Sequence, residues 1–447
     1  MNGINKFFLR DVRCFGGVHE FDIRPLTFLI GENSTGKSTI LGCFQALSNL
    51  SNHRDLFEFQ MDFNLEPYQM GTFTDIARRS IPRTEDFQLG IEYGISKQRV
   101  QLFLTLAERS KGSEPIISQI RWGFEEGEIT FSINENNQNR KNGIKATDRK
   151  NQNKFHVPIN GENWHPLYSL DFLQNWWFSY YTESLDVTSG ELSQFIKRQL
   201  PSLYGKKDSS ASRHGLKRLN LDLYKIHSIA PIRSKPKRTY DPLRETETPD
   251  GSEIPMTLMN LKASSEQEWE DLKKQLVNFG RASGLFSDIE LRELGDSRGD
   301  PFQLKVEVRG GSANLMDVGY GISQVLPILV RIFRAQSTKF LLQQPEVHLH
   351  PKGQAELVSL LVENNRIHKN SFVIETHSDY MINRIRIEIM KGKIKPEDVS
   401  LIYLEPGGNQ VKTHNIRFDA QANMINVPDG YRDFFLKESD ELLGFMD

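Results

Sequence analysis

A glycine-rich segment, GENSTGKST at residues 31–39, has the residue types and spacing that bind a polyphosphate chain. It fits the pattern G-x-x-x-x-G-K-[ST], and it lies between an apolar strand-like run and an apolar helix-like run. In such a loop, backbone N–H groups surround the β-phosphate, the lysine reaches the β- and γ-oxygens, and the serine hydroxyl ligates Mg²⁺. The sequence therefore predicts binding of ATP with Mg²⁺. The predicted nucleotide contacts are Gly31, Glu32, Asn33, Ser34, Thr35, Gly36, Lys37, Ser38 and Thr39, with Lys37 also catalytic and Ser38 also a metal ligand.

Polar residues also follow two apolar, strand-like runs later in the chain. The first run is FLLQQ at residues 340–344, which leads directly into PEVHLHP, and the second is FVIE, which is followed by Thr376, His377 and Ser378. An ATPase with this loop needs a second strand that ends in an acid to hold Mg²⁺, and a group that orients the attacking water. Strand-terminal residues at the edge of a parallel sheet lie where α/β proteins bind ligands. We therefore expect His377 to sense the γ-phosphate; the alternative is an ordinary core or loop histidine.

The elements that must position these residues follow from the apolar periodicity. It predicts strands at 5–12, 18–23 and 26–30, the last of which leads into the loop, and a helix at 38–50. Four runs between residues 87 and 133 (FQLGIEYGI, VQLFLTLAE, IISQIRWGF, EITFSI) predict an antiparallel sheet. After residue 302, short apolar runs alternate with helical segments. This pattern is typical of an α/β fold.

The intervening segments suggest three domains. Residues 1–160 are predicted to form an N-terminal ATPase lobe with the nucleotide loop and an antiparallel β subdomain, residues 161–290 a mainly helical insertion, and residues 291–447 a C-terminal ATPase lobe. Within the insertion, SSEQEWEDLKKQLVNFGRAS predicts a helix whose N-cap is Ser264 or Ser265. Residues 134–154 have almost no apolar side chains, so they are predicted to form a mobile loop or hairpin tip.

The composition restricts the class of partner. In the 447 residues, 56 Lys and Arg nearly balance 58 Asp and Glu. The net charge is therefore too small for the protein as a whole to attract nucleic acid or an anionic membrane electrostatically. The two cysteines lack the spacing of a metal site or a disulfide framework, and no run approaches the roughly 20 apolar residues of a membrane helix. We expect a cytoplasmic protein without membrane contact. Two basic loops, at 139–154 and 206–218, are candidates for nucleic-acid contact, and solvated loops are the alternative.

Taken together, the motifs resemble those of ABC-type ATPases of the SMC, RecF and OLD kind, and in particular their short bacterial AAA-like relatives. The matching segments, in the family's order and spacing, are GENSTGKST, DVGYGISQVLPIL at 317–329, LLQQPEVHLHP at 341–351 and ETHSDYMINRIR at 375–386. The resemblance covers residues 1–60 and 225–447 and is weak between them. It implies a P-loop NTPase fold of the ABC head type, with a mixed sheet, an antiparallel β lobe and a helical insertion.

The resemblance also implies a homodimer or higher oligomer that binds ATP between two copies. A signature segment that contains Gly319, Gly321 and Ser323 would close on the ATP bound to the other copy. A glycine-rich turn at the start of a helix offers N–H donors and a hydroxyl to a γ-phosphate. The alternative is a simple turn before a core helix.

One departure from the family pattern affects the chemistry. Aligned on the family's strand, Gln343 falls where the acid that holds Mg²⁺ is expected, and Gln344 falls where the water-activating glutamate is expected. A glutamine can position water but cannot accept its proton. Glu346 could substitute for the missing base if the strand register shifts. The sequence therefore predicts slow hydrolysis and a long-lived ATP-bound state.

Three functions remain open at this point. The first is an ATP-gated scaffold that regulates a separate effector, a nuclease or toxin, as in anti-phage defence systems of the Septu and PARIS kind that the chain resembles. The second is a DNA-repair ATPase that acts directly on DNA. The third, a transporter subunit, is the weakest because the chain has neither an LSGGQ-type signature nor a DE pair after the strand.

Overall fold

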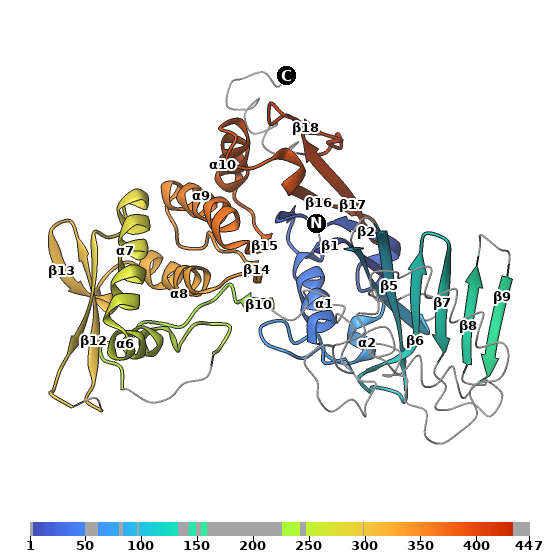
Figure 1. The fold of residues 1–447 in the computed structure, drawn as a ribbon, viewed down its shortest axis with the longest axis horizontal. Helices are drawn as coiled ribbons and strands as arrows, with labels where there is room; N and C mark the ends of the chain where they lie inside the picture. Colours follow the sequence, from blue (N-terminus) through green and yellow to red (C-terminus); the bar gives the residue numbers. More distant parts are fainter. Residues whose placement is uncertain are drawn as a thin grey trace, which may run out of the picture. The chain divides into compact units, whose positions relative to one another are not determined.

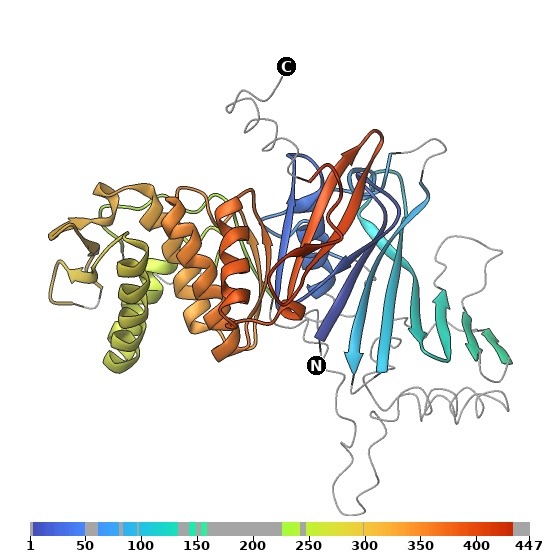
Figure 2. The ribbon, with the colours of Figure 1, turned by 90° about the horizontal axis from the view of Figure 1, so that it is seen from above.

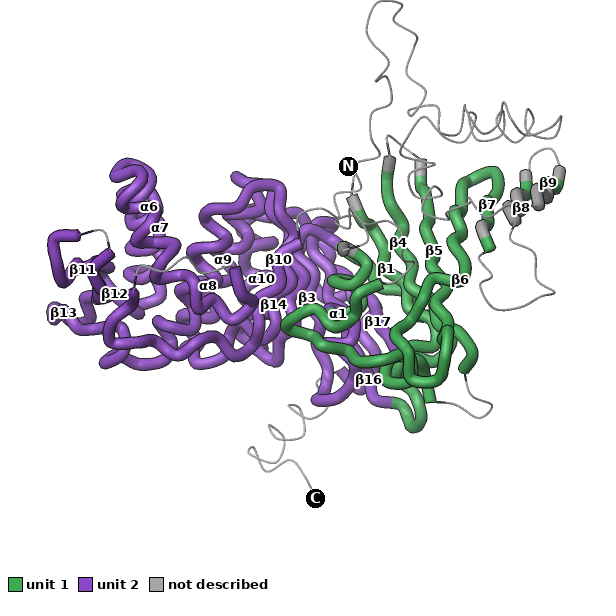
Figure 3. Tube along the Cα trace, turned by 90° about the horizontal axis from the view of Figure 1, so that it is seen from below, with its two compact units in different colours: residues 1–23, 42–224, 407–411 green, residues 24–41, 225–406, 412–447 purple. Residues whose placement is uncertain are grey.

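The computed structural model describes residues 3–49, 61–79, 84–95, 98–132, 143–148, 153–158, 226–241, 247–297 and 299–431. The chain divides into two compact units (Figure 3). Unit 1 comprises Met1–Ile23, Gly42–Tyr224 and Gly407–Val411, and unit 2 comprises Arg24–Leu41, Lys225–Pro406 and Lys412–Asp447. The nucleotide loop belongs to unit 2 together with the later motifs. This division differs from the contiguous domains suggested by the sequence, because β3 pairs with strands from the later part of the chain.

Unit 1 is built on an eight-stranded antiparallel sheet with the order β2-β1-β4-β5-β6-β7-β8-β9 (Figure 1). Apolar side chains alternate along its strands; on β5, for example, Leu102, Leu104 and Leu106 are buried. The four runs predicted between residues 87 and 133 are confirmed as β4 to β7. The elements are β1 (Gly3–Val12), β2 (Phe15–Asp22), the short helix α2 (Phe73–Ile76), β4 (Asp86–Ile95), β5 (Gln98–Glu108), β6 (Pro115–Phe124), β7 (Gly127–Ser132), β8 (Gly143–Asp148) and β9 (Asn153–Pro158).

Strands β8 and β9 correct one prediction from the sequence. Residues 134–154 were expected to form a mobile loop or the tip of a hairpin, but 143–148 form a strand that pairs with β7 on one side and with β9 on the other. The error has a physical cause, because a strand that is held by backbone hydrogen bonds to two neighbouring strands needs few apolar side chains. Two basic segments were candidates for nucleic-acid contact. The structure describes only 143–148, 153 and 154 of the first segment, 139–154, and none of the second segment, 206–218.

Unit 2 contains a seven-stranded sheet with the order β10-β14-β15-β3-β16-β17-β18. Its first five strands are parallel. Along β3, the residues before Gly31 are all buried, as expected for a strand covered on both faces. The strands are β10 (Ile226–Ile229), β14 (Lys339–Gln343), β15 (Ser371–Glu375), β3 (Leu26–Gly31), β16 (Val399–Gly407), β17 (Gln410–Phe418) and β18 (Met424–Ile425).

Helices of unit 2 pack against one another beside this sheet, and α9 and α10 stand side by side in Figure 2. Ser265 caps α7 by accepting a hydrogen bond from the N–H of Glu268, which confirms the predicted helix start. The helices that lie wholly in unit 2 are α6 (Ile254–Ser264), α7 (Glu266–Ser283), α8 (Tyr320–Arg334), α9 (Pro351–His368) and α10 (Asp379–Met390), with 3₁₀ turns η1 (Leu315–Asp317) and η2 (Pro396–Asp398). The helix α1 (Lys37–Asn49) begins in unit 2 and belongs to unit 1 from Gly42 onward. A three-stranded sheet adds β11 (Asp288–Glu293), β12 (Phe302–Val308) and β13 (Gly311–Asn314).

Of the predicted helical insertion, residues 161–225 lie outside the described part of the chain. The described remainder contains β10, α6 and α7 and the start of β11. Among the described residues, no helix is long and apolar enough to cross a membrane.

Candidate active site

The nucleotide loop connects the end of β3 to the start of α1. Gly31, Ser34 and Gly36 have positive φ angles of 145°, 64° and 92°. A side chain at Gly31 would also collide with the structure, because its Cβ would lie 2.5 Å from the carbonyl oxygen of Leu404. The loop ends at the N-terminus of α1, where unpaired N–H groups and the helix dipole favour an anion. Strand, loop and helix therefore have the arrangement that the sequence predicted.

Lys37 is folded back into this loop. Its Nζ donates hydrogen bonds to the carbonyl oxygens of Gly31 at 3.0 Å and Glu32 at 2.6 Å. Burial lowers the pKa of Lys37, while the nearby carboxylates of Glu375, Glu32 and Glu346 oppose that shift. Thr35 stabilises the same turn, since its hydroxyl donates to the carbonyl oxygen of Glu32 at 2.8 Å. The ammonium is thus held where phosphate oxygens can replace backbone carbonyls as its acceptors.

Ser38 joins the loop to the ends of two strands. Its hydroxyl donates to the carboxylate of Glu375, with Oε2 at 2.9 Å and Oε1 at 3.2 Å, and accepts from Nε2 of Gln343 at 2.9 Å. Ser38 and Gln343 were predicted from the sequence, and the structure brings them together. Glu375 was not singled out, although an acid at the end of the apolar run SFVIE was a visible signal. Burial raises the pKa of Glu375, while hydrogen bonds from Ser38 and Gln343 and the charge of Lys37 lower it.

These groups fit Mg²⁺ because they provide oxygen ligands. The described residues contain no cluster of three or more His, Cys, Asp or Glu that could hold a metal. Magnesium in nucleotide sites is held through one or two protein oxygens together with phosphates and water. A hydroxyl next to a carboxylate, as in Ser38 and Glu375, meets that need.

Glu346 reaches the same site from the turn that follows β14. Its Oε1 accepts a hydrogen bond from the backbone N–H of His377 at 2.8 Å, while its Oε2 is buried without a hydrogen-bond partner. Strand β14 ends at Gln343, and Gln344 has a positive φ of 45°, so the chain turns sharply before Pro345. This turn brings Glu346 to the site without any shift in strand register. Burial raises the pKa of Glu346 against the opposing effects of its hydrogen bonds and the charge of Arg233.

Arg233 contacts the backbone carbonyls of the two glutamines and was not singled out from the sequence. It is 2% exposed, and its Nη2 lies 3.4 Å from the carbonyl oxygens of both Gln343 and Gln344. Its Nε and Nη1 have no hydrogen-bond partner. Burial lowers the pKa of Arg233 to about 10, while Glu346 opposes that shift. Gln324 of α8 binds the backbone of Arg233 on both sides. Its side-chain oxygen accepts from the N–H of Arg233 at 3.1 Å, and its Nε2 donates to the carbonyl oxygen of Arg233 at 3.4 Å.

His377 follows β15 and its side chain is exposed. Burial of part of the ring and the charge of Lys37 lower its pKa, which favours the neutral imidazole. Ser378 then caps α10 by accepting from the N–H of Met381 at 3.2 Å, so the T-H-S segment opens a helix as predicted. The structure therefore gathers Lys37, Ser38, Gln343, Glu346 and His377 in one region of unit 2.

The signature residues lie at the start of α8, and the described structure gives them no hydrogen bond to the nucleotide loop. Gly319 is exposed, whereas Ser323 is buried and its hydroxyl donates to the carbonyl oxygen of Tyr320 at 2.9 Å. A Cβ at Gly321 would lie 2.8 Å from the carbonyl oxygen of His348. The signature segment thus packs on the turn that carries Glu346.

The sequence of the chain matches a known family, and its structure is distantly similar to solved structures. The structure is similar to an SMC head domain bound to the C-terminal domain of ScpA derived from Pyrococcus furiosus, with 9% identity, 99% of both chains covered and a TM-score of 0.44. It is also similar to an SMC head domain from Thermotoga maritima, with 10% identity, 92% of this chain and 98% of that chain covered, and a TM-score of 0.39. These likenesses are too distant to support a functional argument.

No curated protein matches the chain. The sequence matches the AAA ATPase domain family over residues 4–382, which is most of its length. That span includes the nucleotide loop, Glu346 and the T-H-S segment. The chain belongs to the AAA ATPase domain family.

Proposed function

We propose that the chain binds Mg-ATP in the loop at residues 31–39 and hydrolyses it slowly, with Glu346 as the base. The observation that carries this proposal is the asymmetry of the Glu346 carboxylate. One oxygen is fixed by the N–H of His377, and the other is buried without a partner. A carboxylate held in this way can accept a proton from a water that attacks the γ-phosphate.

The neighbouring residues have complementary roles in this proposal. Lys37 binds the β- and γ-oxygens, the neutral His377 contacts the γ-phosphate, and Gln344 helps to orient the water, since an amide accepts and donates hydrogen bonds but takes no proton. Ser38 and Gln343 hold the metal side of the nucleotide, where Mg²⁺ supplies neutralisation of phosphate charge. Slow turnover is expected for two reasons. One oxygen of the single base, Glu346, already accepts a hydrogen bond from the N–H of His377, and part of the site comes from a second copy.

The second copy is part of the same proposal. Gly319 and Tyr320 are exposed at the start of a 15-residue helix, and no neighbour lies within 4 Å of a Cβ placed at Gly319. Backbone N–H groups at a helix start are suitable donors for a γ-phosphate. We infer that two copies, or a higher oligomer, close around ATP through this surface.

The sequence motifs resemble those of ATPase subunits of anti-phage defence systems. By that resemblance, the protein would use ATP-dependent closure to regulate or scaffold a separate effector, a nuclease or toxin. The other candidate is direct action on DNA, as in repair ATPases of the RecF and SMC kind. The two differ in whether DNA itself changes the ATPase rate. A duplex or gapped DNA that accelerates turnover in the absence of any other protein would favour the second candidate.

The direct test compares phosphate release by wild type, Glu346→Gln and Gln344→Ala. We expect Glu346→Gln to lower turnover by about 10²-fold or more while ATP still binds, because the base is lost and the shape is kept. Gln344→Ala should lower turnover less. If Glu346→Gln hydrolyses ATP at the wild-type rate, Glu346 is not the base.

A further inference from the structure

Glu375 has no role in the proposal so far, although it touches the serine of the nucleotide loop. We propose that Glu375, at the end of β15, is the acid that holds Mg²⁺ and supplies the negative charge that the neutral Gln343 at the end of β14 lacks. This inference rests on the proposed Mg-ATP binding. Measuring metal affinity and nucleotide affinity separately distinguishes failure of the Glu375 assignment from failure of Mg-ATP binding.

The sheet order explains how an acid can serve from this strand. β15 lies between β14 and β3, so Glu375 pairs with Gln343 on one side and with Leu29 on the other. All three strands are parallel, and their carboxyl ends therefore meet at one edge of the sheet. The end of β15 is next to the strand that leads into the loop. An acid there is one strand closer to the loop than an acid at position 343 would be.

The contacts of Glu375 place its carboxylate beside Ser38, the residue of the loop that is expected to bind Mg²⁺. Both oxygens of Glu375 lie within hydrogen-bond distance of the Ser38 hydroxyl, at 2.9 and 3.2 Å. This hydroxyl is the loop's oxygen ligand for Mg²⁺. Gln343 donates its amide N–H to the same hydroxyl at 2.9 Å. Ser38 is therefore shared by a charged and a neutral side chain, and only the charged one can compensate a divalent cation.

The burial of Glu375 needs an explanation that packing does not provide. The residue is 4% exposed, yet its carboxylate forms no ion pair with any residue that the structure describes. A buried carboxylate is costly unless it is paired or binds a metal. Lys37, whose charge acts on Glu375, directs its hydrogen bonds to two backbone carbonyls instead. Glu346 is the other acid of the site, and it is oriented by His377.

The pairing of Gln343 with Glu375 allows an exchange experiment. The variants are Glu375→Gln, Gln343→Glu, and the double variant with both changes, which moves the charge from one strand end to the next. The probe is Mn²⁺, which shares the preference of Mg²⁺ for oxygen ligands. Its affinity is measured by electron paramagnetic resonance in the presence of a non-hydrolysable ATP analogue. The affinity for the analogue in EDTA is measured separately, because it reports the loop without metal.

We expect Glu375→Gln to weaken Mn²⁺ binding by about 10- to 100-fold, the range typical when a group that supports a metal is removed. The double variant should recover most of that affinity. Glu346→Gln is the matched control, because it removes the other carboxylate of the site and should leave Mn²⁺ affinity within about threefold, a small change on that scale. Wild-type Mn²⁺ affinity in Glu375→Gln would overturn the proposal. Failure of both Mn²⁺ and the analogue to bind wild type when they are present together would instead overturn the proposed Mg-ATP binding itself.

Discussion

Two carboxylates in one site differ in what they contact, and that difference assigns them different chemistry. Glu346 has one oxygen bonded to the N–H of His377 and one unpartnered oxygen, whereas both oxygens of Glu375 lie at the hydroxyl of Ser38. Lys37, Ser38 and Gln343 could be predicted because the loop pattern and the strand end identify them. Glu375 and Arg233 could not be assigned, because a sequence does not reveal which strands become lateral neighbours.

Gly321 provides a test at the level of one atom. A methyl group there would lie 2.8 Å from the carbonyl oxygen of His348, whereas one at Gly319 has no neighbour within 4 Å. We expect Gly321→Ala to lower the free energy of unfolding by about 1–2 kcal/mol, since the backbone of a tight turn must move. Gly319→Ala should change it by about 0.5 kcal/mol or less, a typical value for open surface positions. Urea unfolding of both variants measures the difference, and equal stabilities would contradict the predicted clash.

At the scale of elements, the strands of unit 1 could be predicted because apolar residues alternate along them, as on β6. The strand β8 could not, because it depends on backbone pairing with both β7 and β9. The helix α7 was predictable from its capping serine and the acids in its first turn, Glu266 and Glu268. Local signals therefore identify elements with a periodic face or a cap. They fail where a neighbouring strand supplies the stabilisation.

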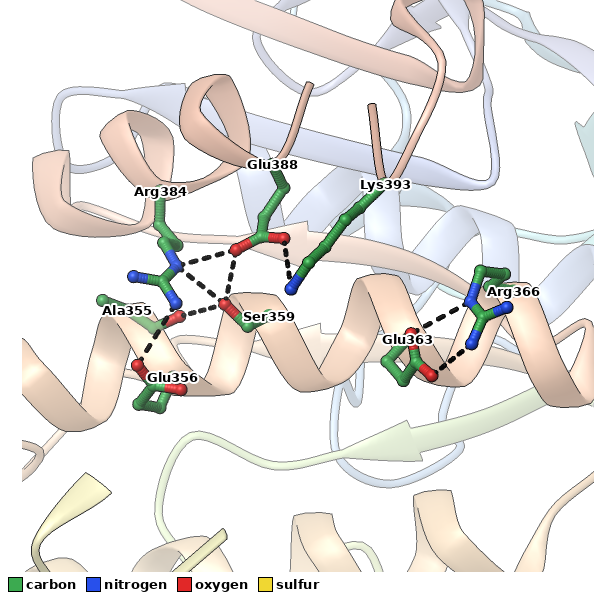
Figure 4. A network of polar contacts seen from close by, with 8 residues as sticks. All are labelled: Ala355, Glu356, Ser359, Glu363, Arg366, Arg384, Glu388 and Lys393. Carbon is green, nitrogen blue, oxygen red and sulfur yellow. Dashed lines mark hydrogen bonds and ion pairs between the residues drawn. The ribbon is translucent and has the colours of Figure 1, made fainter. Parts of the chain in front are cut away.

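The contact between α9 and α10 depends on a buried charge (Figure 4). Glu388 is fully buried and accepts from Ser359 at 2.9 Å and from Arg384 at 3.0 Å, and Lys393 lies 3.4 Å from its other oxygen. Burial alone would raise the pKa of Glu388, but the Ser359 hydroxyl and the two cations outweigh it and hold the pKa below the ordinary value of 4.5. The carboxylate form is therefore the one that joins the helices.

We expect Glu388→Gln to lower the free energy of unfolding by about 1–3 kcal/mol at pH 7, because charged hydrogen bonds are replaced by neutral ones. A lowered pKa in the folded state contributes stability above the unfolded value, and this stability is lost as the pH falls through the folded value. The difference between wild type and variant should therefore shrink below about pH 4.5. Glu363→Gln is the control, since its pair with Arg366 on α9 is exposed and should contribute about 0–1 kcal/mol. A difference that does not change with pH would contradict this account.

At the scale of the whole molecule, the proposed switch predicts a change in mass. Wild type with Mg-ATP should shift towards twice the monomer mass in size-exclusion chromatography with light scattering, and Glu346→Gln should hold the larger species longer because hydrolysis is blocked. Gly319→Arg places a large side chain on the proposed contact surface and should remain monomeric with ATP bound. A monomer under every condition would contradict closure around ATP. A dimer that forms equally well without nucleotide would contradict the switch.

The order of the strands in unit 2 also has a consequence for the synthesis of the chain. Strand β3 is buried between β15 and β16, and the bond from Ser38 to Glu375 spans 337 residues. At ~5–20 residues per second, a ribosome needs roughly 20–70 seconds to cover that distance. In the meantime the strands of unit 1 from β4 to β7 can pair with partners that follow closely in the chain. The apolar segment LTFLI has no such partner, so the nucleotide loop is among the first parts to be synthesised and among the last to be completed.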